Sequence, residues 1–525
     1  MLSALLNLHR TGLLTVPGLC RTLEGVMTTG VNMMAMLKVA ARLFPRRIAI
    51  TDDHERLTYL ELWRQSEALA AALQSDFGVG PGHKAALACR NHAAFIKAIF
   101  AFSRLGSHLY FISPGMRVDQ FHALDERLRF DFHIHDDPLV DLGPKSLPAY
   151  RPTGTSIDRL SKQPRPTARL KRVRGGNIVL MTGGTTGQPK PASRKPSLFD
   201  FLPPLAALLG KLKLGDCLSL YVAPPIYHSY GLSALAIGIL LGAEIHTAAR
   251  FDAARACEVI ARRRIDMLVT IPLMLRRMLN HDAVALSSLR QIFCGADVLT
   301  PALADETLAR LGPILFNTYG TAEGGTVSLA DATELRRKPG TVGKPIRGVR
   351  LRLLDEAGRE VGTGAVGRIC VSSAWTANEK GWVETGDLGF RDADGYCFLC
   401  GRVDDMIVSG GENVYPMELE NVLARHEDVA AVAAVGIPDA EFGWRLKAVV
   451  VVHPGRTADR TALIDWLKPR IARHQMPAVI EFRDDLPCTA VGKPDKKALQ
   501  SGGLTICNDS DGEAGDGAGA ARAVP

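Results

Sequence analysis

The sequence predicts an α/β protein with a large N-terminal domain of several subdomains and a small, mobile α+β C-terminal lid. Short apolar strands alternate with helix-like segments over most of the chain, which favours parallel αβ layers. Val349-Arg350-Leu351-Arg352-Leu353 then alternates with period two, as a half-exposed antiparallel strand does. A junction follows this region. We expect an N-terminal domain at 1–400, a hinge at 401–404, a lid at 405–500 and a disordered tail at 501–525.

The first αβ layer begins with a clear helix signal. Thr58 and Glu61 have the spacing of a capping box, and the residues behind them recur at helical spacing, namely Leu62, Ser66, Leu69 and Leu73. A strand at 85–88, a helix at 95–105 and a strand at 109–112 come next. This order predicts parallel strands joined by helices.

The alternation resumes at residue 218. We expect a helix at 231–241 and strands at 218–222, 267–270, 291–294 and 314–317. Several of these strands end in loops with polar residues, which suits a ligand crevice at the carboxyl edge of a sheet. The period-two segment predicts a smaller β subdomain. The expected lid is built from helices at 416–424 and 462–471 and apolar segments at 429–435 and 448–452.

The composition is that of a globular enzyme. The 525 residues are 46% hydrophobic and 22% charged, with a formal net charge of +8 and a pI near 9.0. The positive charge favours anionic partners such as nucleotides, CoA or a lipid surface, whereas no basic and aromatic block predicts nucleic-acid binding. The basic stretch from Lys162 to Arg174 is either a solvated linker or a contact for a phosphate or lipid headgroup.

The sequence gives no signal for export or for a membrane span. Ten cysteines are scattered, which favours reduced thiols and a cytoplasmic location. Cys397-x-x-Cys400 has no second ligand pair and is typical of a buried strand, not of a zinc site. The N-terminus lacks a basic n-region, and no apolar run reaches spanning length. Any membrane contact would be peripheral, through segment 31–43, unless that segment is a helix packed on its own domain.

An apolar strand at 178–182 leads into a loop of glycines and hydroxyls that ends in Pro189-Lys190. Glycine N–H groups, threonine hydroxyls and a lysine suit a polyphosphate, although a loop of this composition is also common on surfaces. The loop has neither Walker A nor GxGxxG spacing. Its candidate phosphate ligands are Thr182, Gly183, Gly184, Thr185, Thr186, Gly187 and Lys190.

Further motifs follow this loop in a fixed order. They are Pro225-Ile226-Tyr227-His228-Ser229-Tyr230-Gly231, Tyr319-Gly320-Thr321-Ala322-Glu323, Thr385-Gly386-Asp387, Gly401-Arg402-Val403-Asp404-Asp405 and Val491-Gly492-Lys493. Together they resemble the adenylate-forming superfamily of acyl-CoA synthetases, adenylation domains and beetle luciferases, over about residues 40 to 500. Segment 406–416 is most similar to bacterial fatty-acyl-CoA and aryl-CoA ligases. Segment 10–14 is similar to the start of actinobacterial-type long-chain fatty-acyl-CoA ligases.

The resemblance implies a two-step reaction that uses ATP, Mg²⁺ and CoA. A carboxylate attacks the α-phosphorus of ATP to give acyl-AMP and pyrophosphate, and a thiol then displaces AMP. The crowded negative charge of the first step calls for fixed donors and cations. By resemblance, the loop at 182–190 holds the β- and γ-phosphates, Glu323 holds Mg²⁺, and Lys493 reaches the carboxylate and the α-phosphate.

The same resemblance implies the nucleotide and acyl pockets. The residues implied for the nucleoside are Gly295, Ala296, Tyr319, Gly320, Thr321, Asp387 and Arg402. Tyr319 would stack on adenine near Gly295-Ala296, while Asp387 would accept hydrogen bonds from the ribose with Arg402 assisting. His228, just before an apolar helix, would border the acyl pocket.

Lys493 lies far along the chain from the phosphate loop, so it must arrive by domain closure. In the superfamily the lid turns about a hinge residue, here Asp404. The turn withdraws Lys493 and presents Ser409, Gly410 and Gly411 to the CoA arm. Glycines there would let pantetheine pass close to the backbone.

Several positions depart from the superfamily pattern. Segment 372–382 is short, and five residues differ from those that are frequent in relatives: Gly183 (Ser), Pro191 (Gly), Ala322 (Thr), Arg368 (Glu) and Gln475 (Lys). These differences favour a specialised or slower member.

Substrate choice is expected to depend on the helix at 230–241 and on residues near Phe251, Gly295 and Tyr319. Small residues on the helix, Gly231, Ala234 and Gly238, would leave room for an apolar tail, although they equally suit a buried helix. No basic residue for a second carboxylate stands out, so we expect a medium- or long-chain fatty acid first and an aromatic acid second. Two alternatives stay open: acyl transfer to the phosphopantetheine of an acyl carrier protein, and a nucleotide-binding protein with little catalysis.

Overall fold

The computed structural model describes residues 12, 15–136, 146–163, 170–182, 190–194, 210, 218–374, 376, 381–489 and 493–501, without the side chains of 182, 190–192, 194 and 501. The chain divides into two compact units, Met1–Met406 with Ala490–Gly492, and Ile407–Thr489 with Lys493–Pro525. The expected hinge at 401–404 lies next to this division and stays a prediction. The expected tail at 501–525 lies outside the described residues, apart from the backbone of Ser501.

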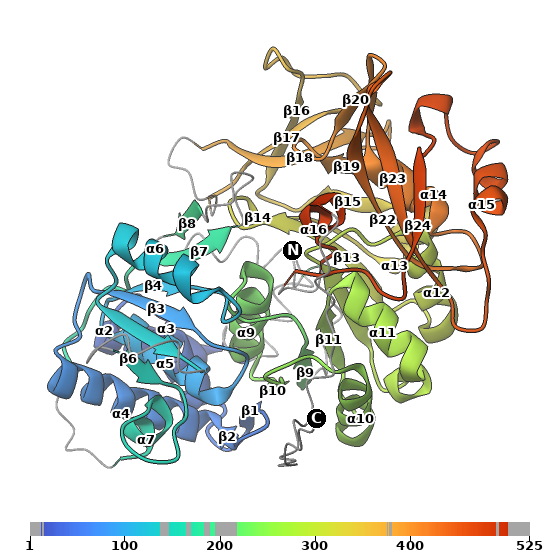
Figure 1. Cartoon of the computed structure of the whole chain (residues 1–525). Helices are drawn as coiled ribbons and strands as arrows, with labels where there is room; N and C mark the ends of the chain where they lie inside the picture. Colours follow the sequence, from blue (N-terminus) through green and yellow to red (C-terminus); the bar gives the residue numbers. More distant parts are fainter. Residues whose placement is uncertain are drawn as a thin grey trace, which may run out of the picture. The chain divides into compact units, whose positions relative to one another are not determined.

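The first unit contains a six-stranded sheet with the order β6-β5-β3-β4-β7-β8 (Figure 1). Its strands are β3 (Lys84–Ala88), β4 (His108–Phe111), β5 (Phe132–His135), β6 (Ser146–Pro148), β7 (Ile178–Thr182) and β8 (Lys190–Arg194). All neighbours are parallel except β7 and β8, which pair antiparallel with Thr182 opposite Lys190. The two ends of the predicted phosphate loop are therefore adjacent.

Helices surround this sheet and pack on one another (Figure 1): α2 (Val16–Thr29), α3 (Met33–Leu43), α4 (Tyr59–Phe77), α5 (Ala93–Arg104), α6 (Val118–Leu128) and α7 (Ile157–Lys162). The predicted capping box is present at the start of α4, because Thr58 and Glu61 each bind the other's backbone N–H. The fully buried α5 joins the parallel strands β3 and β4, as the alternation predicts.

The second sheet of this unit is a hydrogen-bonded path of thirteen strands, β16-β17-β18-β19-β15-β14-β13-β12-β11-β9-β10-β1-β2. Its parallel part consists of β1 (Ile48–Thr51), β9 (Ser219–Val222), β10 (Glu244–His246), β11 (Met267–Thr270), β12 (Gln291–Gly295) and β13 (Leu315–Thr321). The connecting elements are α9 (Ser229–Leu241), α10 (Ala253–Arg263), α11 (Pro272–Asp282), η1 (Val284–Leu286) and α12 (Pro301–Leu311), while β2 (Arg56–Thr58) pairs antiparallel with β1. The carboxyl ends of β12 and β13 consequently lie side by side.

The expected β subdomain forms the antiparallel part of the same sheet. It comprises β14 (Gly325–Ala330), β15 (Thr341–Pro345), β16 (Arg350–Leu354), β17 (Gly367–Ser372), β18 (Val383–Arg391) and β19 (Cys397–Arg402), with α13 (Ala332–Arg337). It is hydrogen-bonded to the parallel part through β13 and β14. Leu351 and Leu353 are buried while Arg350 and Arg352 are exposed, which confirms the period-two prediction. Cys397 and Cys400 lie buried on β19, as expected.

The second unit is a small α+β domain. Its sheet has the order β21-β20-β23-β22 with β24 on β23. The strands are β20 (Ile407–Ser409), β21 (Glu412–Val414), β22 (Val429–Asp439), β23 (Gly443–Val452) and β24 (Val479–Phe482). The helices are α14 (Pro416–Leu423), α15 (Arg460–Leu467), η2 (Arg473–Gln475) and α16 (Lys496–Ser501). A large N-terminal domain and a small C-terminal domain are thus both present.

The methionine-rich segment 31–43 is a helix packed on its own domain. Met34 and Leu37 of α3 are fully buried, and Met33 and Met36 are partly buried against the same core. Among the residues that the structure describes, no helix is both long and apolar enough to cross a bilayer. The sequence did not lead us to expect α2, which precedes α3.

Candidate active site

Side chains from three strands meet at Asp387. The Tyr319 hydroxyl on β13 donates a hydrogen bond to Asp387 Oδ2 at 2.7 Å, and the Arg402 guanidinium on β19 donates to Oδ1 at 3.1 Å. Asp387 pairs in register with Arg402 across β18 and β19, which sets the second contact. Burial, together with the neighbouring carboxylate, raises the pKa of Tyr319 well above its usual value, so its hydroxyl remains a donor. Each Asp387 oxygen can still accept a further hydrogen bond.

The backbone beside Tyr319 is tightly constrained at Gly295 and Ala296. Gly295 ends β12 opposite Thr318, and a Cβ at Gly295 would lie 2.0 Å from Thr318 Oγ1. Ala296 has φ +63°, a left-handed conformation that residues with a Cβ rarely adopt. Such strain is typical of ligand sites and costs about 1 kcal/mol or more. The role of these residues in a nucleoside site next to Tyr319 stays a prediction.

Glu323 lies in the tight turn between β13 and β14. Thr321 Oγ1 accepts a hydrogen bond from Gly324 N at 2.9 Å, and Gly320 packs so closely that a Cβ would lie 2.3 Å from the Gly325 oxygen. Glu323 is half-buried, and its carboxylate makes no hydrogen bond or ion pair with any other described residue. A hard, unpaired oxygen donor of this kind fits Mg²⁺ held mainly by phosphates and water.

The described residues that cluster like metal ligands lie elsewhere, at Cys89, His92 and Asp136. His92 Nε2 lies 2.7 Å from Asp136 Oδ1, and the Arg90 N–H donates to Oδ2 at 2.7 Å. Burial, together with the neighbouring Asp136, raises the pKa of the Cys89 thiol well above its usual value, so without a metal the thiol stays protonated. We interpret this cluster as a satisfied structural network.

The loop that carries His228 is held by a residue that sequence reasoning missed. The buried Asn91 donates from Nδ2 to the Pro224 oxygen at 3.0 Å and accepts from Ile226 N at 2.7 Å. His228 occupies the N-cap position of α9, with its ring centroid 4.4 Å from that of Tyr227. The position of Asn91 between a strand and a helix is a sequence signal for a capping or bridging role. The signal does not identify the partners, because they lie more than a hundred residues away in the sequence.

Two departures from the superfamily pattern have structural partners. Arg368, where Glu is frequent, donates to Glu384 Oε1 at 3.1 Å and to the Asp355 oxygen at 3.1 Å. Gln475, where Lys is frequent, accepts from Ala472 N at 2.8 Å and donates to Glu418. Arg368 and Gln475 therefore hold neighbouring segments in place, and none of their partners is a predicted site residue.

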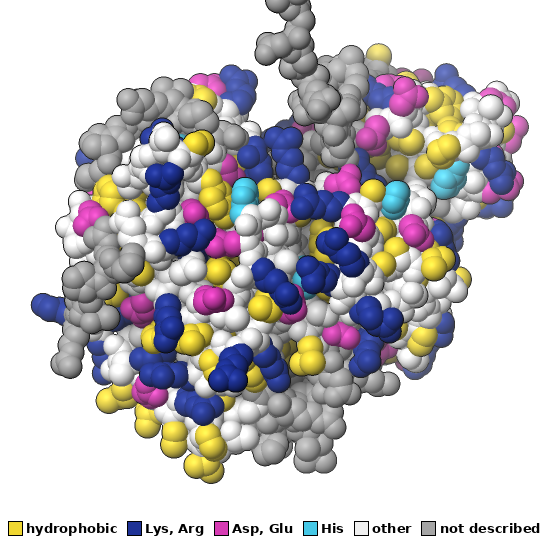
Figure 2. All heavy atoms as spheres, turned by 90° about the horizontal axis from the view of Figure 1, so that it is seen from below, with side chains coloured by type: hydrophobic (Ala, Val, Ile, Leu, Met, Phe, Trp, Pro, Cys, Tyr) yellow, Lys and Arg dark blue, Asp and Glu magenta, His cyan; other side chains and the backbone are white. Residues whose placement is uncertain are grey.

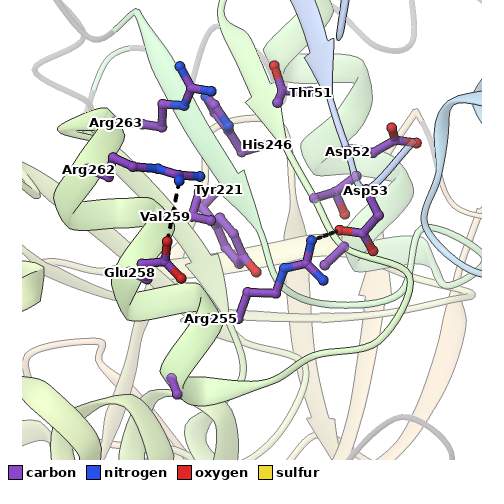
Figure 3. Close-up of a pocket in the computed structure, with 13 residues that line it drawn as sticks. Thr51, Asp52, Asp53, Tyr221, His246, Arg255, Glu258, Val259, Arg262 and Arg263 are labelled. Carbon is purple, nitrogen blue, oxygen red and sulfur yellow. Dashed lines mark ion pairs between the residues drawn. The ribbon is translucent and has the colours of Figure 1, made fainter. Parts of the chain in front are cut away.

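A cavity of about 580 Å³ lies beside α10 (Figure 3), but none of the predicted site residues line it. Arginines of α10 reach into it, together with Asp53 from the end of β1. Arg255 pairs with Asp53, and Arg262 pairs with Glu258 at 3.4 Å. These ion pairs neutralise much of the lining charge, so we assign no ligand to the cavity.

The second unit carries the predicted CoA-facing segment and Lys493. Ser409 pairs with Glu412, and the two residues between them, Gly410 and Gly411, have φ +57° and +90°, as in a type I′ hairpin turn. Gly410 N donates to the Phe442 oxygen at 3.0 Å, and Phe442 is partly exposed. Lys493 is half-buried, and its carbonyl accepts from Thr489 N at 2.7 Å.

The structure thus gathers part of the predicted site within the first unit. Gly295, Ala296, Tyr319, Asp387 and Arg402 come together at the carboxyl edge of the sheet. The loop residues Gly183, Gly184, Thr185, Thr186 and Gly187 lie outside the described residues, as do the side chains of Thr182 and Lys190. Ser409, Gly410, Gly411 and Lys493 belong to the second unit, and their roles stay predictions.

Family models of known proteins match this chain. The model of the AMP-binding enzymes matches residues 37–379, and that of the AMP-binding enzyme C-terminal domain matches residues 418–493. The protein therefore belongs to the AMP-binding enzyme family, as the resemblance to adenylate-forming enzymes implied. The match to the first model covers more than half of the chain.

Curated relatives include ligases for different acids. A feruloyl-CoA synthase of Amycolatopsis sp is 30% identical over 86% of this chain and 95% of its own length. A medium/long-chain-fatty-acid–CoA ligase of Mycobacterium tuberculosis is 33% identical over 61% of this chain and 60% of its own. A fatty acid–[acyl-carrier-protein] ligase of Streptomyces coeruleorubidus is 28% identical over 87% and 93%.

A solved structure confirms the fold class. The o-succinylbenzoate-CoA synthetase of Bacillus subtilis, in complex with its acyl-adenylate intermediate, aligns with a TM-score of 0.77 at 25% identity. The alignment covers 88% of this chain and 97% of that one.

Proposed function

We propose that this protein is an ATP-dependent ligase that joins an apolar monocarboxylic acid, first of all a medium- or long-chain fatty acid, to CoA. The observation that carries the proposal is Asp387, held between Tyr319 and Arg402 beside the strained Ala296. A fixed, partly exposed carboxylate at the carboxyl edge of the sheet suits the two hydroxyls of a ribose. Two of its relatives, a feruloyl-CoA synthase and a medium/long-chain-fatty-acid–CoA ligase, support the same reaction class.

The proposed reaction has two steps. In the first, a carboxylate oxygen of the acid attacks the α-phosphorus of ATP, and the bond from that phosphorus to pyrophosphate breaks. In the second, the sulfur of CoA attacks the acyl carbon, and the carbon–oxygen bond to AMP breaks while the thiol proton leaves to solvent. Because negative charge grows on the α-phosphate in the first step, fixed cations and N–H donors are expected to lower its barrier most.

Glu323 is the residue that we assign to Mg²⁺. When bound, the ion would neutralise phosphate charge and hold the leaving group in line. The hydrogen bond from Gly324 N to Thr321 Oγ1 fixes the turn, so the Glu323 carboxylate starts from one backbone position. Because Glu323 has no partner among the described residues, no ion pair with any of them has to break before it binds a cation.

The acyl site is proposed at α9 and the neighbouring ends of β12 and β13. The Tyr230 hydroxyl accepts from Thr318 Oγ1 at 3.1 Å, which ties α9 to β13. The small residues of α9 serve packing more than we expected. A Cβ at Gly231 would lie 2.3 Å from the Pro225 oxygen, and one at Gly238 would lie 2.8 Å from Ile245 Cδ1. The acyl tail would therefore have to lie against half-buried side chains of α9, such as Ile237 and Leu240.

The thiol step is proposed on the second unit. The backbone of Gly410 and Gly411 carries no side chain at the turn, so a narrow pantetheine arm can approach it. Phe442, in the connection before β23, and Trp444, at the start of β23, are 38% and 43% exposed, and flat aromatic rings suit the adenine of CoA. Lys493 would complete the first step after domain closure about Asp404.

An acyl carrier protein remains the second candidate acceptor, because one relative is a fatty acid–[acyl-carrier-protein] ligase. An aromatic acid is the competing substrate, supported by the feruloyl-CoA synthase. A cytoplasmic location is part of the proposal, since none of the described cysteines forms a disulfide.

The test is acyl-thioester formation by purified protein with ATP and Mg²⁺, over fatty and aromatic acids, with CoA or a phosphopantetheinylated carrier protein. Fatty acyl-CoA as the main product would support the proposal. Aryl-CoA would reassign the acid, and a product only on the carrier protein would reassign the acceptor. No thioester and no pyrophosphate across the panel would contradict ligase activity altogether.

A further inference from the structure

Helix α2 is packed with its polarity reversed. Its small residues face the protein: Gly18, Gly25 and Thr29 are buried, and a Cβ at Gly25 would lie 2.9 Å from Val39 Cγ2 of α3. Its large apolar residues face outward instead: Val16 is 76% exposed, Leu19 53%, Leu23 63% and Met27 56%. An ordinary surface helix would turn this stripe toward the core.

The stripe is continuous along the helix. Its members are spaced by three, four and four residues, so they lie on one side of a helix about 21 Å long. Single exposed apolar side chains are normal, but an apolar row of this length marks an interaction surface. Figure 2 shows exposed hydrophobic side chains gathered at one edge of the molecule, next to lysines and arginines.

Three exposed cations flank the C-terminal end of α2. Val173 N donates to the Thr29 oxygen at 3.3 Å, and the buried Asn32 donates to the Val173 oxygen at 3.0 Å. The buried Arg104 also binds the Lys171 oxygen at 2.7 Å. The backbone of 171–174 is thereby fixed beside the helix end, while the side chains of Lys171, Arg172 and Arg174 stay exposed.

These cations have no counter-charge among the described residues. Lys171, Arg172 and Arg174 form no ion pair there, and Glu24, the single acidic residue of α2, already pairs with Lys38 and Arg42. An apolar helix face beside unpaired basic residues complements a bilayer with anionic headgroups. A second copy of the chain would instead bring the same uncompensated cations together.

We propose that α2 lies in the surface of an anionic lipid bilayer, with Val16, Leu19, Leu23 and Met27 in the acyl region and Lys171, Arg172 and Arg174 at the headgroups. The proposed membrane contact is made by α2 and not by segment 31–43, the segment that the sequence suggested for it and that packs on its own domain. It is independent of the acid and acceptor proposed above.

Cys20 provides a direct reporter. Among the eight described free cysteines it alone is exposed, and it lies on α2 next to Leu19. We would label Cys20 of the full-length protein with a polarity-sensitive thiol fluorophore, in a background with Cys217→Ser and Cys507→Ser. Vesicles of phosphatidylcholine alone are compared with vesicles that also contain phosphatidylglycerol.

The expected result is a blue shift and co-flotation with the anionic vesicles, both weakened by salt. Leu19→Gln with Leu23→Gln should weaken partition at least roughly tenfold. Lys171→Gln with Arg172→Gln and Arg174→Gln should weaken it roughly a hundredfold. Because these side chains are exposed, the melting temperature should not change.

Matched controls use equally exposed side chains elsewhere. Val284→Gln changes an apolar residue that is 80% exposed, and Arg263→Gln with Arg336→Gln and Arg347→Gln removes the same charge. Both should bind vesicles like the wild type. Absence of flotation, or equal loss in the controls, would overturn the proposal. Self-association abolished by the Leu19 and Leu23 changes would assign the surface to a second copy instead.

Discussion

The Tyr319 hydroxyl lies 2.7 Å from Asp387 Oδ2, although their strands, β13 and β18, are not neighbours in the sheet. The antiparallel part of the sheet therefore curls back toward the carboxyl edge of the parallel part. One carboxylate then has a phenol on one oxygen and a guanidinium on the other. These two contacts fix the orientation of the Asp387 carboxylate.

Removing the Tyr319 hydroxyl should weaken nucleotide binding. In Tyr319→Phe, the Asp387 carboxylate keeps its contact with Arg402 but loses the hydrogen bond from the phenol. A hydrogen bond to a charged group contributes about 1.5–3 kcal/mol. We expect the KM for ATP to rise roughly tenfold, with a smaller change in the KM for the acid. Pyrophosphate release measures both constants. Tyr396→Phe, which alters another buried tyrosine, is the control; an unchanged KM for ATP in Tyr319→Phe would refute the role.

Lys493 should act in one half-reaction alone. In Lys493→Ala, acyl-AMP formation should fall by at least roughly a hundredfold because a cation at the α-phosphate is lost. Thioester formation from supplied acyl-AMP should stay near the wild-type rate. Lys497→Ala, on the exposed side of α16, should affect neither step. Equal loss of both half-reactions in Lys493→Ala would contradict a role for Lys493 in acyl-AMP formation alone.

Asn91 should position the acyl side of the site. Asn91→Asp replaces the donor to the Pro224 oxygen with a carboxylate, so the loop before His228 should shift. We expect the KM for the acid to rise more than the KM for ATP, and stability to fall by about 1–3 kcal/mol. Asn32→Asp alters another buried amide with backbone partners and should lower stability without changing the KM for the acid. The same KM pattern in both variants would mean that Asn91 is merely structural.

Lys97 should be a strong determinant of stability. Its fully buried ammonium contacts Glu55 Oε1 at 2.7 Å and Asp158 Oδ1 at 3.2 Å. Lys97→Met removes the ammonium from both carboxylates, and this should lower the free energy of unfolding by about 3–5 kcal/mol near neutral pH. The half-exposed Lys162 contacts the same carboxylates, so Lys162→Gln should cost much less. Thermal unfolding measures both, and equal losses would contradict this prediction.

The cost of losing Lys97 should also depend on pH. Burial acts to raise the pKa of Asp158, but Lys162 and Lys97 outweigh it and hold the pKa below its ordinary value. A depressed carboxyl pKa adds stability above the unfolded pKa, about 3.9, and loses that contribution as pH falls. The difference in melting temperature between wild type and Lys97→Met should therefore stay nearly constant down to about pH 4 and shrink as pH falls further, through the depressed native pKa of Asp158. A difference that does not shrink well below pH 4 would contradict the role of Asp158.

Local signals were enough to predict much of the fold. The capping box at Thr58, the alternating burial of β16 and the buried strand with Cys397 follow from residues only a few positions apart. The contacts that shape the site do not. Tyr319 and Asp387 are 68 residues apart, and Asn91 and Ile226 are 135 apart. Which strands curl toward one another depends on the packing of the whole unit.

Helix α2 shows a different limit of sequence reasoning. Val16, Leu19, Leu23 and Met27 have the same periodicity as a core-facing stripe. Periodicity identifies the apolar side of a helix but not what covers it. The exposure of these four side chains and the burial of Gly18 and Gly25 show that this side points outward.

In the proposed reaction, the carboxylate of an acid attacks the α-phosphorus of ATP. Oxygen-18 in the carboxylate of the acid tests this most directly, with the products analysed by mass spectrometry after turnover with unlabelled ATP and CoA. If an acyl-adenylate forms, AMP should carry one labelled oxygen, and pyrophosphate should be unlabelled. Labelled inorganic phosphate with ADP, or unlabelled AMP, would contradict an acyl-adenylate intermediate.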